Sequence, residues 1–260
     1  MRSELLFNPR LLCERLAIAS IRKRRLAELK GTPAAVLTLG HIDTMELVKL
    51  ARDAGVKIVY DVGANVGTWS LLAKSLIPTA IVHAFEPLAE HQARFYDNLL
   101  LGRVTDVTLH TVALGAGNTT ATMHITDFSD ASSLLRPNDT SASHFGVKEV
   151  RQVPLQVYRL DDYRRSQRLP WPDLLKLDIQ GYELEALRGA PECLAATRAV
   201  IAEVSFIPYY EQQCLFHDLV HHLAEAGLFL TALGSGTPTG RPMGQTDALF
   251  VRMGHAELKP

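Results

Sequence analysis

Short apolar segments alternate with helical segments from residue 57 onwards, and this alternation restricts the fold more than any other feature of the chain. The apolar segments are rich in Val, Ile and Leu and are predicted to be strands; they are 57–62, 80–85, 104–112, 174–179, 199–204, 228–233 and 248–251. Helical patterns lie between them at 66–76, 88–101, from about 183, and at 211–226. Such alternation is typical of a mostly parallel sheet that helices cover on both faces. The sequence therefore predicts an α/β three-layer sandwich.

Two further segments, 119–125 and 153–158, predict extra strands on either side of a polar stretch at 127–150. That stretch is Ser-rich and too long for a simple connection. Loops of this kind are usually functional, so we expect it to close over a site. His144 lies in it and is a candidate base, although a loop histidine is more often an ordinary surface residue.

The first 55 residues lack the strand pattern, and we expect a helical extension at 1–55 that packs on a main domain at 56–260. One helix is predicted from Glu4 to Leu29 and another after Thr44. Residues 1–30 hold eight Lys/Arg and three Glu, a net charge of +5.

A basic run at Arg22–Arg25 has two interpretations. It is the solvated end of a helix, where cations interact favourably with the helix dipole, or it attracts an anionic substrate or a membrane surface.

Composition excludes several classes of protein. A net charge of −1 disfavours a nucleic-acid binder, which is normally basic. No apolar run approaches the ~18 residues of a membrane span, and no secretory signal pattern precedes the domain. Cys13, Cys193 and Cys214 lack CxxC spacing, which indicates a reducing compartment and no thiolate zinc site. We therefore expect a cytoplasmic protein without a transmembrane segment, a nucleic-acid partner or a metal.

The segment VYDVGANVGTWS, residues 59–70, is the sharpest local feature. A strand that carries Asp61 runs into Gly63, Ala64, Asn65 and Gly67, and a helix follows. Glycine permits a tight turn that brings backbone amides close to a ligand, and the helix N-terminus favours a carboxylate or a phosphate. Such turns at strand ends are where open α/β sheets bind ligands.

The spacing of this turn argues against a dinucleotide, which requires G-x-G-x-x-G. Here the pattern is D-x-G-x-x-x-G, and the acid before Gly63 suits a positively charged ligand better than a diphosphate. S-adenosylmethionine carries a sulfonium and an amino group. We therefore expect Asp61, Gly63 and Asn65 to hold its methionyl part.

The second and third strands support a nucleoside ligand. Glu86 follows the second strand, where an acid accepts hydrogen bonds from both ribose hydroxyls. Pro87 and Leu88 are expected to form a wall beside the adenine, and Ala113 and Leu114, after the third strand, to border it. An acid at a helix N-terminus is also common for structural reasons, so Glu86 alone is weak support.

A third segment, LLKLDIQGYELEALRGA at 174–190, delivers Asp178 to a strand tip before a turn at Gln180 and a helix that opens with Glu183. A carboxylate in this position is typical of α/β active sites. It is also a common helix cap, and the two roles are compatible.

The ordered motifs DVGANVG, AFEP, ALG (113–115), SSL (132–134), LDDY (160–163), the 174–190 segment and IAEV (201–204) resemble those of FkbM-type methyltransferases. The resemblance implies a class I, Rossmann-like S-adenosylmethionine-dependent fold with a seven-stranded sheet whose last strand is antiparallel. It also implies O-methylation of a sugar, a polyketide or a similar metabolite. The family usually has Glu where this chain has Gln180, and glutamine accepts no proton. Asp178 and Glu183 are therefore the candidate catalytic carboxylates.

Other interpretations stay open at this point. The alternatives are a binding module with a nucleotide pocket but no catalysis, a methyltransferase that acts on nucleic acid or protein, and an NAD-dependent reductase. His217 and His221 have helical zinc spacing but no third ligand, and Tyr209 and Tyr210 are packing or acceptor-pocket aromatics. The leading prediction is a methyltransferase with a small-molecule or glycan acceptor, and a homo-oligomer is left open.

Overall fold

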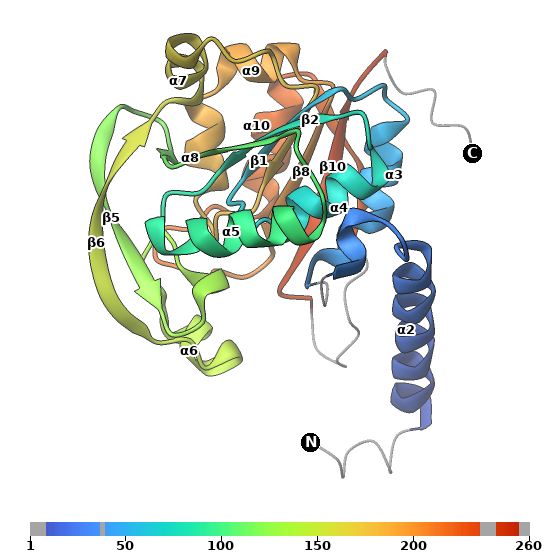
Figure 1. Ribbon diagram of the computed structural model, residues 1–260. Coiled ribbons are helices and arrows are strands. Elements are labelled where there is room, and N and C mark those ends of the chain that lie inside the picture. Colours follow the sequence, from blue (N-terminus) through green and yellow to red (C-terminus); the bar gives the residue numbers. More distant parts are fainter. Residues whose placement is uncertain (1–8, 37–39, 235–242, 255–260) are drawn as a thin grey trace.

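The computed structural model describes residues 9–36, 40–234 and 243–254. A seven-stranded sheet in the order β3-β2-β1-β7-β8-β10-β9 forms its centre (Figure 1). The pairs β3–β2, β2–β1, β1–β7 and β7–β8 are parallel, and β10 is antiparallel to both of its neighbours. This confirms the predicted sheet with its antiparallel last strand. The strands are β1 (Ile58–Val62), β2 (Ile81–Phe85), β3 (Val107–His110), β7 (Leu174–Leu177), β8 (Ala199–Ser205), β9 (Leu228–Leu233) and β10 (Gln245–Arg252).

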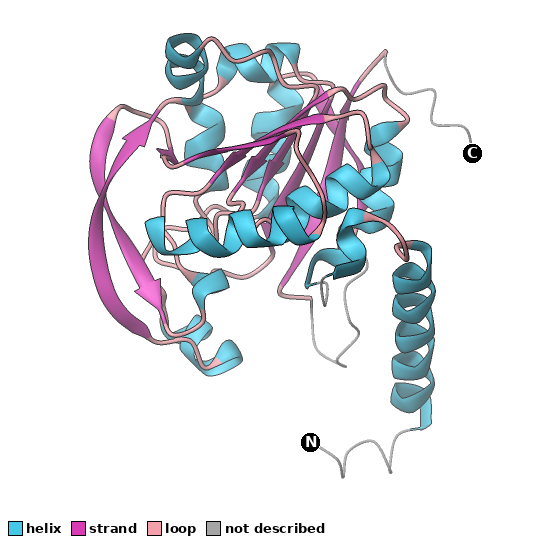
Figure 2. Cartoon of the chain, viewed as in Figure 1, coloured by secondary structure: helices cyan, strands magenta, loops and turns pink. Residues whose placement is uncertain are grey.

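Helices cover both faces of this sheet (Figure 2). The cause is visible along β1, where Val59 packs into the apolar cluster on one face and Tyr60 into the cluster on the other. Burial on both faces is why the strands are almost continuously apolar. One cluster includes residues of α3 (Met45–Arg52), α4 (Thr68–Leu76) and α5 (Ala89–Leu101), and the other includes residues of α7 (Leu160–Gln167), α8 (Glu183–Arg188), α9 (Pro191–Ala196) and α10 (Phe216–Glu225).

A small second sheet accounts for the extra strands that the sequence predicts. Its order is β4-β6-β5, with β4 parallel and β5 antiparallel to β6, and it stands beside the main sheet in Figure 1. Between β5 and β6 the polar stretch is more than a simple connection, as its length predicts. It contains η3 (Ser129–Ala131) and α6 (Asp139–Phe145), because the Asn138 side chain caps α6 by accepting from two backbone N–H groups. The strands are β4 (Ala113–Leu114), β5 (Thr119–Thr126) and β6 (Glu149–Tyr158).

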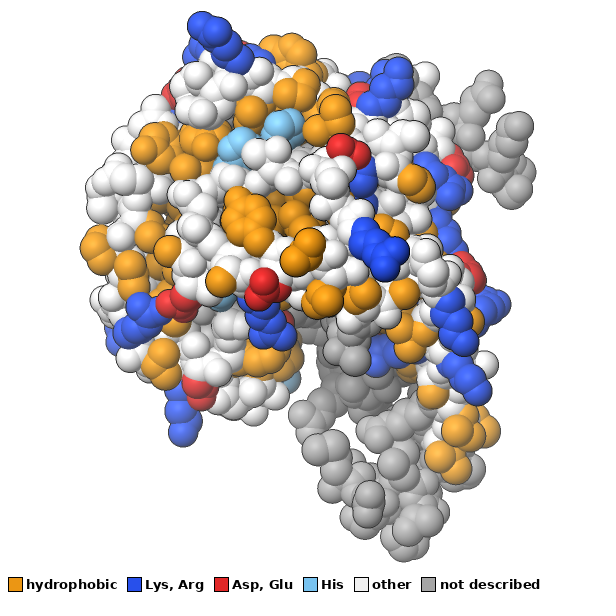
Figure 3. Space-filling model, viewed as in Figure 1, with side chains coloured by type: hydrophobic (Ala, Val, Ile, Leu, Met, Phe, Trp, Pro, Cys, Tyr) orange, Lys and Arg blue, Asp and Glu red, His pale blue; other side chains and the backbone are white. Residues whose placement is uncertain are grey.

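The N-terminal part of the described chain comprises α2 (Pro9–Glu28), η1 (Pro33–Val36), η2 (Gly40–Thr44) and α3. Figure 1 shows α2 extending away from the body, and basic side chains gather along it in Figure 3. Its end is anchored because Asp43 accepts hydrogen bonds from Arg22 (2.5 Å) and Arg25 (3.1 Å). Part of the basic run is therefore paired within the chain. The division into domains at residue 55 stays a prediction.

Some element boundaries differ from those that the sequence predicts. The helix predicted from Glu4 begins at Pro9 among the described residues, and residues 4–8 lie outside them. The strand predicted from 104 begins at Val107. Likewise α10 begins at Phe216 and not at 211, because the Gln213 side chain accepts from the backbone N–H groups of Tyr209 and Tyr210 and holds that stretch as a turn. None of the described helices has the length and apolar character to span a membrane.

The turn between β1 and α4 is fixed by one glycine. Gly63 has φ +80°, and a Cβ there would lie 1.9 Å from the backbone oxygen of Asp178. The first and the third strand-end motifs of the sequence therefore touch through bare backbone. Any side chain at position 63 would force the two apart.

Substitution Gly63→Ala should lower the free energy of unfolding by more than ~3 kcal/mol, because a left-handed φ and a backbone overlap act together. Urea denaturation measures this. Gly146→Ala is the matched control: Gly146 has φ +71° but open space around its Cβ position, and a loss of only about 1 kcal/mol is expected. Equal losses in the two variants would contradict the assigned contact.

Candidate functional site

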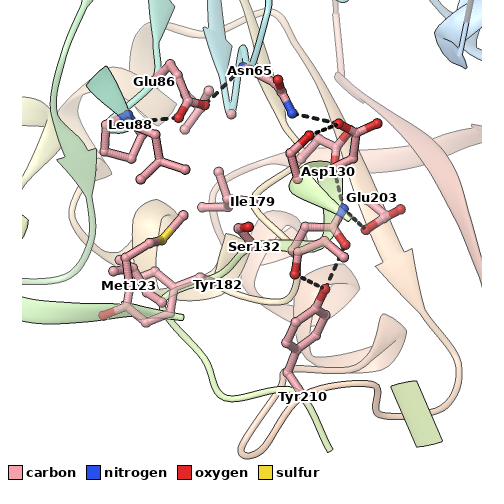
Figure 4. Close-up of a pocket in the computed structure, with 18 of the residues that line it drawn as sticks. Asn65, Glu86, Leu88, Met123, Asp130, Ser132, Ile179, Tyr182, Glu203 and Tyr210 are labelled. Carbon is pink, nitrogen blue, oxygen red and sulfur yellow. Dashed lines mark hydrogen bonds between the residues drawn. The ribbon is translucent and has the colours of Figure 1, made fainter. Parts of the chain in front are cut away.

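A cavity of about 630 Å³ lies at the carboxyl ends of the parallel strands (Figure 4). This volume is typical of a small-molecule site. Its walls come from the β1–α4 turn, the end of β2, the segment after β3, the β7–α8 turn and the ends of β8 and β10. Residues 127–147, which we call the roof segment, complete the enclosure with side chains from η3 and α6.

The β1–α4 turn is bound to the end of β2. Gly63 and Ala64 both donate their N–H groups to the backbone oxygen of Phe85, at 3.0 and 3.1 Å. Asn65, at φ 46°, donates its N–H to Glu86 Oε2 at 3.0 Å. The expectation of bare amides facing a ligand is therefore wrong for these positions, because β2 and Glu86 already accept from them. Gly63 and Asn65 line the cavity, whereas Ala64 and Gly67 do not.

Asp61 lies beneath the cavity and does not line it. It is fully buried, accepts from Ser70 Oγ at 2.6 Å and forms an ion pair with Lys176 Nζ at 3.1 Å. Neither carboxylate oxygen of Asp61 is exposed to the cavity, so Asp61 cannot make the predicted direct contact with a ligand. Its position supports the site from below through Lys176.

Lys176 ties the floor of the site together. Its Nζ donates to the backbone oxygen of Gly63 at 3.2 Å and lies 3.7 Å from Asp178 Oδ2. Burial opposes its charge, but the carboxylates of Asp61 and Asp178 raise the pKa of Lys176 on balance. One buried cation therefore holds the tips of β1 and β7 in register with the glycine turn.

Glu86 lies at one end of the cavity with both oxygens oriented by the protein. Oε2 accepts from Asn65 and Oε1 accepts from the N–H of Leu88 at 2.9 Å. His91 Nδ1 is 3.2 Å from Oε1. Burial lowers the pKa of His91, but the nearby carboxylate of Glu86 raises that pKa overall. Pro87 and Leu88 continue the wall beside Glu86.

The cavity therefore brings together most of the cofactor residues that the sequence predicts. Ala113 and Leu114 form an apolar wall with Val112 and Met123. The predicted residues that line the cavity are Gly63, Asn65, Glu86, Pro87, Ala113, Leu114 and Asp178.

Glu183 has a structural position and does not line the cavity. Its Oε1 accepts from the N–H groups of Ile179 (2.9 Å) and Gly181 (3.2 Å) and so fixes the β7–α8 turn. Burial raises the pKa of Glu183 to about 7. The expectation that it is a catalytic carboxylate is not supported by this geometry, because its oxygens bind backbone amides away from the cavity.

Gln180 links the floor to the roof segment. At φ 58°, it donates Nε2 to Asp178 Oδ1 (2.8 Å) and to Glu203 Oε2 (3.1 Å). Its backbone oxygen accepts from Ser133 Oγ at 2.8 Å. The Tyr210 hydroxyl has the side-chain oxygen of Gln180 at 3.0 Å and the backbone oxygen of Ala131 at 2.9 Å as acceptors for its one hydrogen.

Two carboxylates at the far end of the cavity have no assigned role in the sequence interpretation. Glu203 ends β8, and Asp247 lies near the start of β10. Burial and the neighbouring carboxylates raise the pKa of both groups, that of Asp247 to about 7. Glu203 has the same signal as Asp178, an acid at the end of an apolar strand. Asp247 could be placed only once the antiparallel direction of β10 was known.

The remaining candidates are placed as follows. Tyr209 and Tyr210 are buried and line the cavity. His144 does not line it and packs against the Tyr209 ring, with centroids 5.8 Å apart. The side chains of His217 and His221 are 77% and 78% exposed. No cluster of metal-ligating side chains occurs among residues 9–36, 40–234 and 243–254.

The family comparison agrees with this arrangement. The FkbM methyltransferase domain matches residues 61–229, which include the glycine turn, Glu86 and Asp178. The chain belongs to the FkbM methyltransferase family.

Two similar proteins are named for O-methylation or for methylation of a sugar acid. The 2-O-methyltransferase NoeI of Sinorhizobium fredii is 26% identical over 163 residues, which cover 60% of this chain and 66% of that protein. The hexuronic acid methyltransferase AglP of Haloferax volcanii is 24% identical over 201 residues, which cover 73% of this chain and 77% of that protein. Among solved structures, magnesium protoporphyrin IX methyltransferase from Synechocystis has 16% identity, covers 81% of this chain and 80% of its own, and has a TM-score of 0.45.

A pH series tests the structural position of Glu183. The folded protein holds this carboxyl at a pKa of about 7, above the ~4.3 of an unfolded glutamate, so it binds the proton more tightly. The stabilisation is complete below pH ~4.3 and is lost as the pH rises through 7. Glu183→Gln stays neutral and should be more stable than the wild type by up to about 3 kcal/mol at pH 8, with a difference below about 1 kcal/mol at pH 4.5.

Urea unfolding at the two pH values measures this difference. The same variant should keep its methyl-transfer activity, because its amide oxygen still accepts from the β7–α8 turn. Loss of activity with normal stability would instead restore Glu183 as a catalytic carboxylate.

Proposed function

We propose that this protein transfers a methyl group from S-adenosylmethionine to a hydroxyl of a sugar or a similar small metabolite. The observation that carries the proposal is the charge of the cavity. Its lining contains the carboxylates of Glu86, Asp130, Asp178, Glu203 and Asp247, and no Lys or Arg among the described residues. Such a surface attracts a sulfonium and an ammonium and repels a diphosphate. Membership of the FkbM family and the similarity to the 2-O-methyltransferase NoeI and the hexuronic acid methyltransferase AglP support the same conclusion.

The residues present fit this cofactor. Glu86 is oriented by two backbone amides and keeps lone pairs for two ribose hydroxyls. The wall of Leu88, Ala113, Leu114 and Met123 offers an apolar slot for adenine. Asn65 and Asp178 would lie against the methionyl part. When bound, the cofactor supplies a methyl carbon already activated by its sulfonium.

The contribution of the protein is alignment and proton acceptance. The Lys176 network and the hydrogen bond from Gln180 hold Asp178 at the cavity wall. An acceptor hydroxyl placed against Asp178 would transfer its proton to that carboxylate as the new bond forms, an effect typically worth ~10²–10⁴-fold in rate. The hydrogen bond from Ser133 Oγ to the backbone oxygen of Gln180 fastens the roof segment beside Asp178. The EC 2.1.1 class follows from the proposal, and a cytoplasmic location and a homo-oligomer stay predictions.

Glu86→Gln should weaken S-adenosylmethionine binding by about 10–100-fold, because charge-assisted hydrogen bonds to the ribose are lost. Titration calorimetry measures the affinity. Glu90→Gln is the matched control: Glu90 lies on the first turn of α5, pairs with Arg151 outside the cavity, and should leave the affinity unchanged. A Glu86→Gln protein with wild-type affinity would rule out the ribose assignment.

Asp178→Asn should lower kcat by about 10²–10⁴-fold and change the affinity for adenosylhomocysteine by less than about tenfold. Formation of adenosylhomocysteine is followed with a panel of methyl glycosides as acceptors. The variant keeps the size of the side chain, so a normal urea midpoint is expected. Unchanged turnover would remove Asp178 as the proton acceptor.

A further inference from the structure

The end of the cavity that is farthest from Glu86 needs its own explanation. Figure 4 shows Glu86 and Leu88 at one end of the pocket and Glu203 and Tyr210 at the other. The cofactor residues come from β1, β2 and the segment after β3, whereas Glu203 and Asp247 come from β8 and β10. These strands lie on the other side of β7 in the sheet. A second ligand group therefore has a separate set of side chains available.

Glu203 and Asp247 are direct partners in the antiparallel ladder between β8 and β10. Side chains of directly opposed residues lie on the same face of the sheet, and like charges in that position destabilise it. Neither carboxylate has a salt bridge to a described residue within 4 Å, and Lys176 is shared by Asp61 and Asp178. Two directly opposed acids at a cavity edge therefore lower the stability of the fold. A ligand that binds both acids would account for their presence.

The hydrogen bonds of the two acids differ. Glu203 accepts from the side-chain amides of Gln180 at 3.1 Å and Gln245 at 2.7 Å, so both of its oxygens are oriented. The carboxylate of Asp247 accepts no hydrogen bond from the described residues, and it lines the cavity. Asp247 is half-buried at the cavity wall, so its unpartnered carboxylate is available to a ligand that binds there.

The groups around these acids are suited to hydroxyls. The pKa of Asp247, raised to about 7 by burial, leaves part of that carboxyl protonated at neutral pH, and a protonated carboxyl donates as well as accepts. The amides of Gln180 and Gln245 have both functions too. The rings of Tyr209 and Phe145, with centroids 5.0 Å apart, add an aromatic wall. The combination of carboxyl, amide and aromatic surface matches a compact molecule with several hydroxyls.

A carboxylate on the acceptor would meet repulsion here. Glu203, Asp247 and Asp178 surround this end of the cavity, and no described lining residue is Lys or Arg. Resting on the proposed function, we propose that Glu203 and Asp247 form the acceptor subsite of the same pocket, which takes an uncharged, hydroxyl-rich sugar and rejects a sugar acid. The proposed acceptor class thus differs from the hexuronic acid for which the relative AglP is named.

Calorimetry on the adenosylhomocysteine complex at pH 8 tests this proposal. The probes are methyl glycosides of glucose, galactose and mannose, each paired with its uronide, which differs only by a carboxylate at C6. We expect at least one neutral glycoside to bind, and to bind at least tenfold more tightly than its uronide. Asp247→Asn has nearly the same shape and no hydrogen bond to lose. It should strengthen uronide binding about 5–10-fold, with adenosylhomocysteine affinity unchanged.

A second variant and a control separate subsite charge from general charge. Glu203→Gln should also reduce the ratio of the glycoside affinity to the uronide affinity. Glu225→Gln removes a carboxylate that is 66% exposed on α10 and should change neither binding constant. Equal or tighter binding of the uronides overturns the proposal, as does an unchanged ratio in Asp247→Asn. If the protein binds adenosylhomocysteine but none of the glycosides, the acceptor subsite is overturned and the methyltransferase function is left intact. If it does not bind adenosylhomocysteine, that function itself is overturned.

Discussion

The ion pair between Lys176 and Asp61 is the interaction on which the site depends. Two side chains from neighbouring strands meet in the centre of the sheet, where neither charge has water around it. Removal of either partner would leave an uncompensated buried charge, which typically costs 3–5 kcal/mol. The same ammonium reaches Gly63 and Asp178, so the pair also sets where the glycine turn and the strand-end acid lie. The acid of the glycine motif therefore acts on the site through the lysine.

The sheet and the glycine turn could be predicted from the sequence because both depend on local patterns. Continuous apolar strands require burial on both faces, and the spacing at Asp61, Gly63 and Gly67 requires a turn. The roles of individual side chains depend on neighbours that are distant in the chain. The sequence predicts that Asp61 contacts a ligand, because its partner Lys176 lies 115 positions further along the chain and is brought beside it only by the fold. The sequence likewise predicts that Glu183 is an active-site acid, whereas in the structure it accepts from the backbone N–H groups of Ile179 and Gly181.

Gln180 shows how a departure from a family pattern acquires a physical reason. Its amide donates to Asp178, which directly follows β7, and to Glu203 on the neighbouring strand β8. A glutamate at this position would offer no donor to either carboxylate and would add a third negative charge between them. The glutamine is therefore matched to the acids around it. The sequence alone could not show this, because Glu203 is 23 residues further along and Asp247 lies on a strand of opposite direction.

The backbone contact between Gly63 and Asp178 links two parts of the site that the chain builds separately. A Cβ at position 63 would lie 1.9 Å from the Asp178 oxygen, so the two turns meet through bare backbone and a movement of one affects the other. Evolution of a new acceptor specificity by moving the β7–α8 turn would therefore disturb the proposed cofactor end of the cavity as well. Substitutions at the ends of β8 and β10 change side chains without moving either turn, so the acceptor end can change there more freely. Acceptor range in this lineage should accordingly diverge at the outer strands while the glycine turn stays constant.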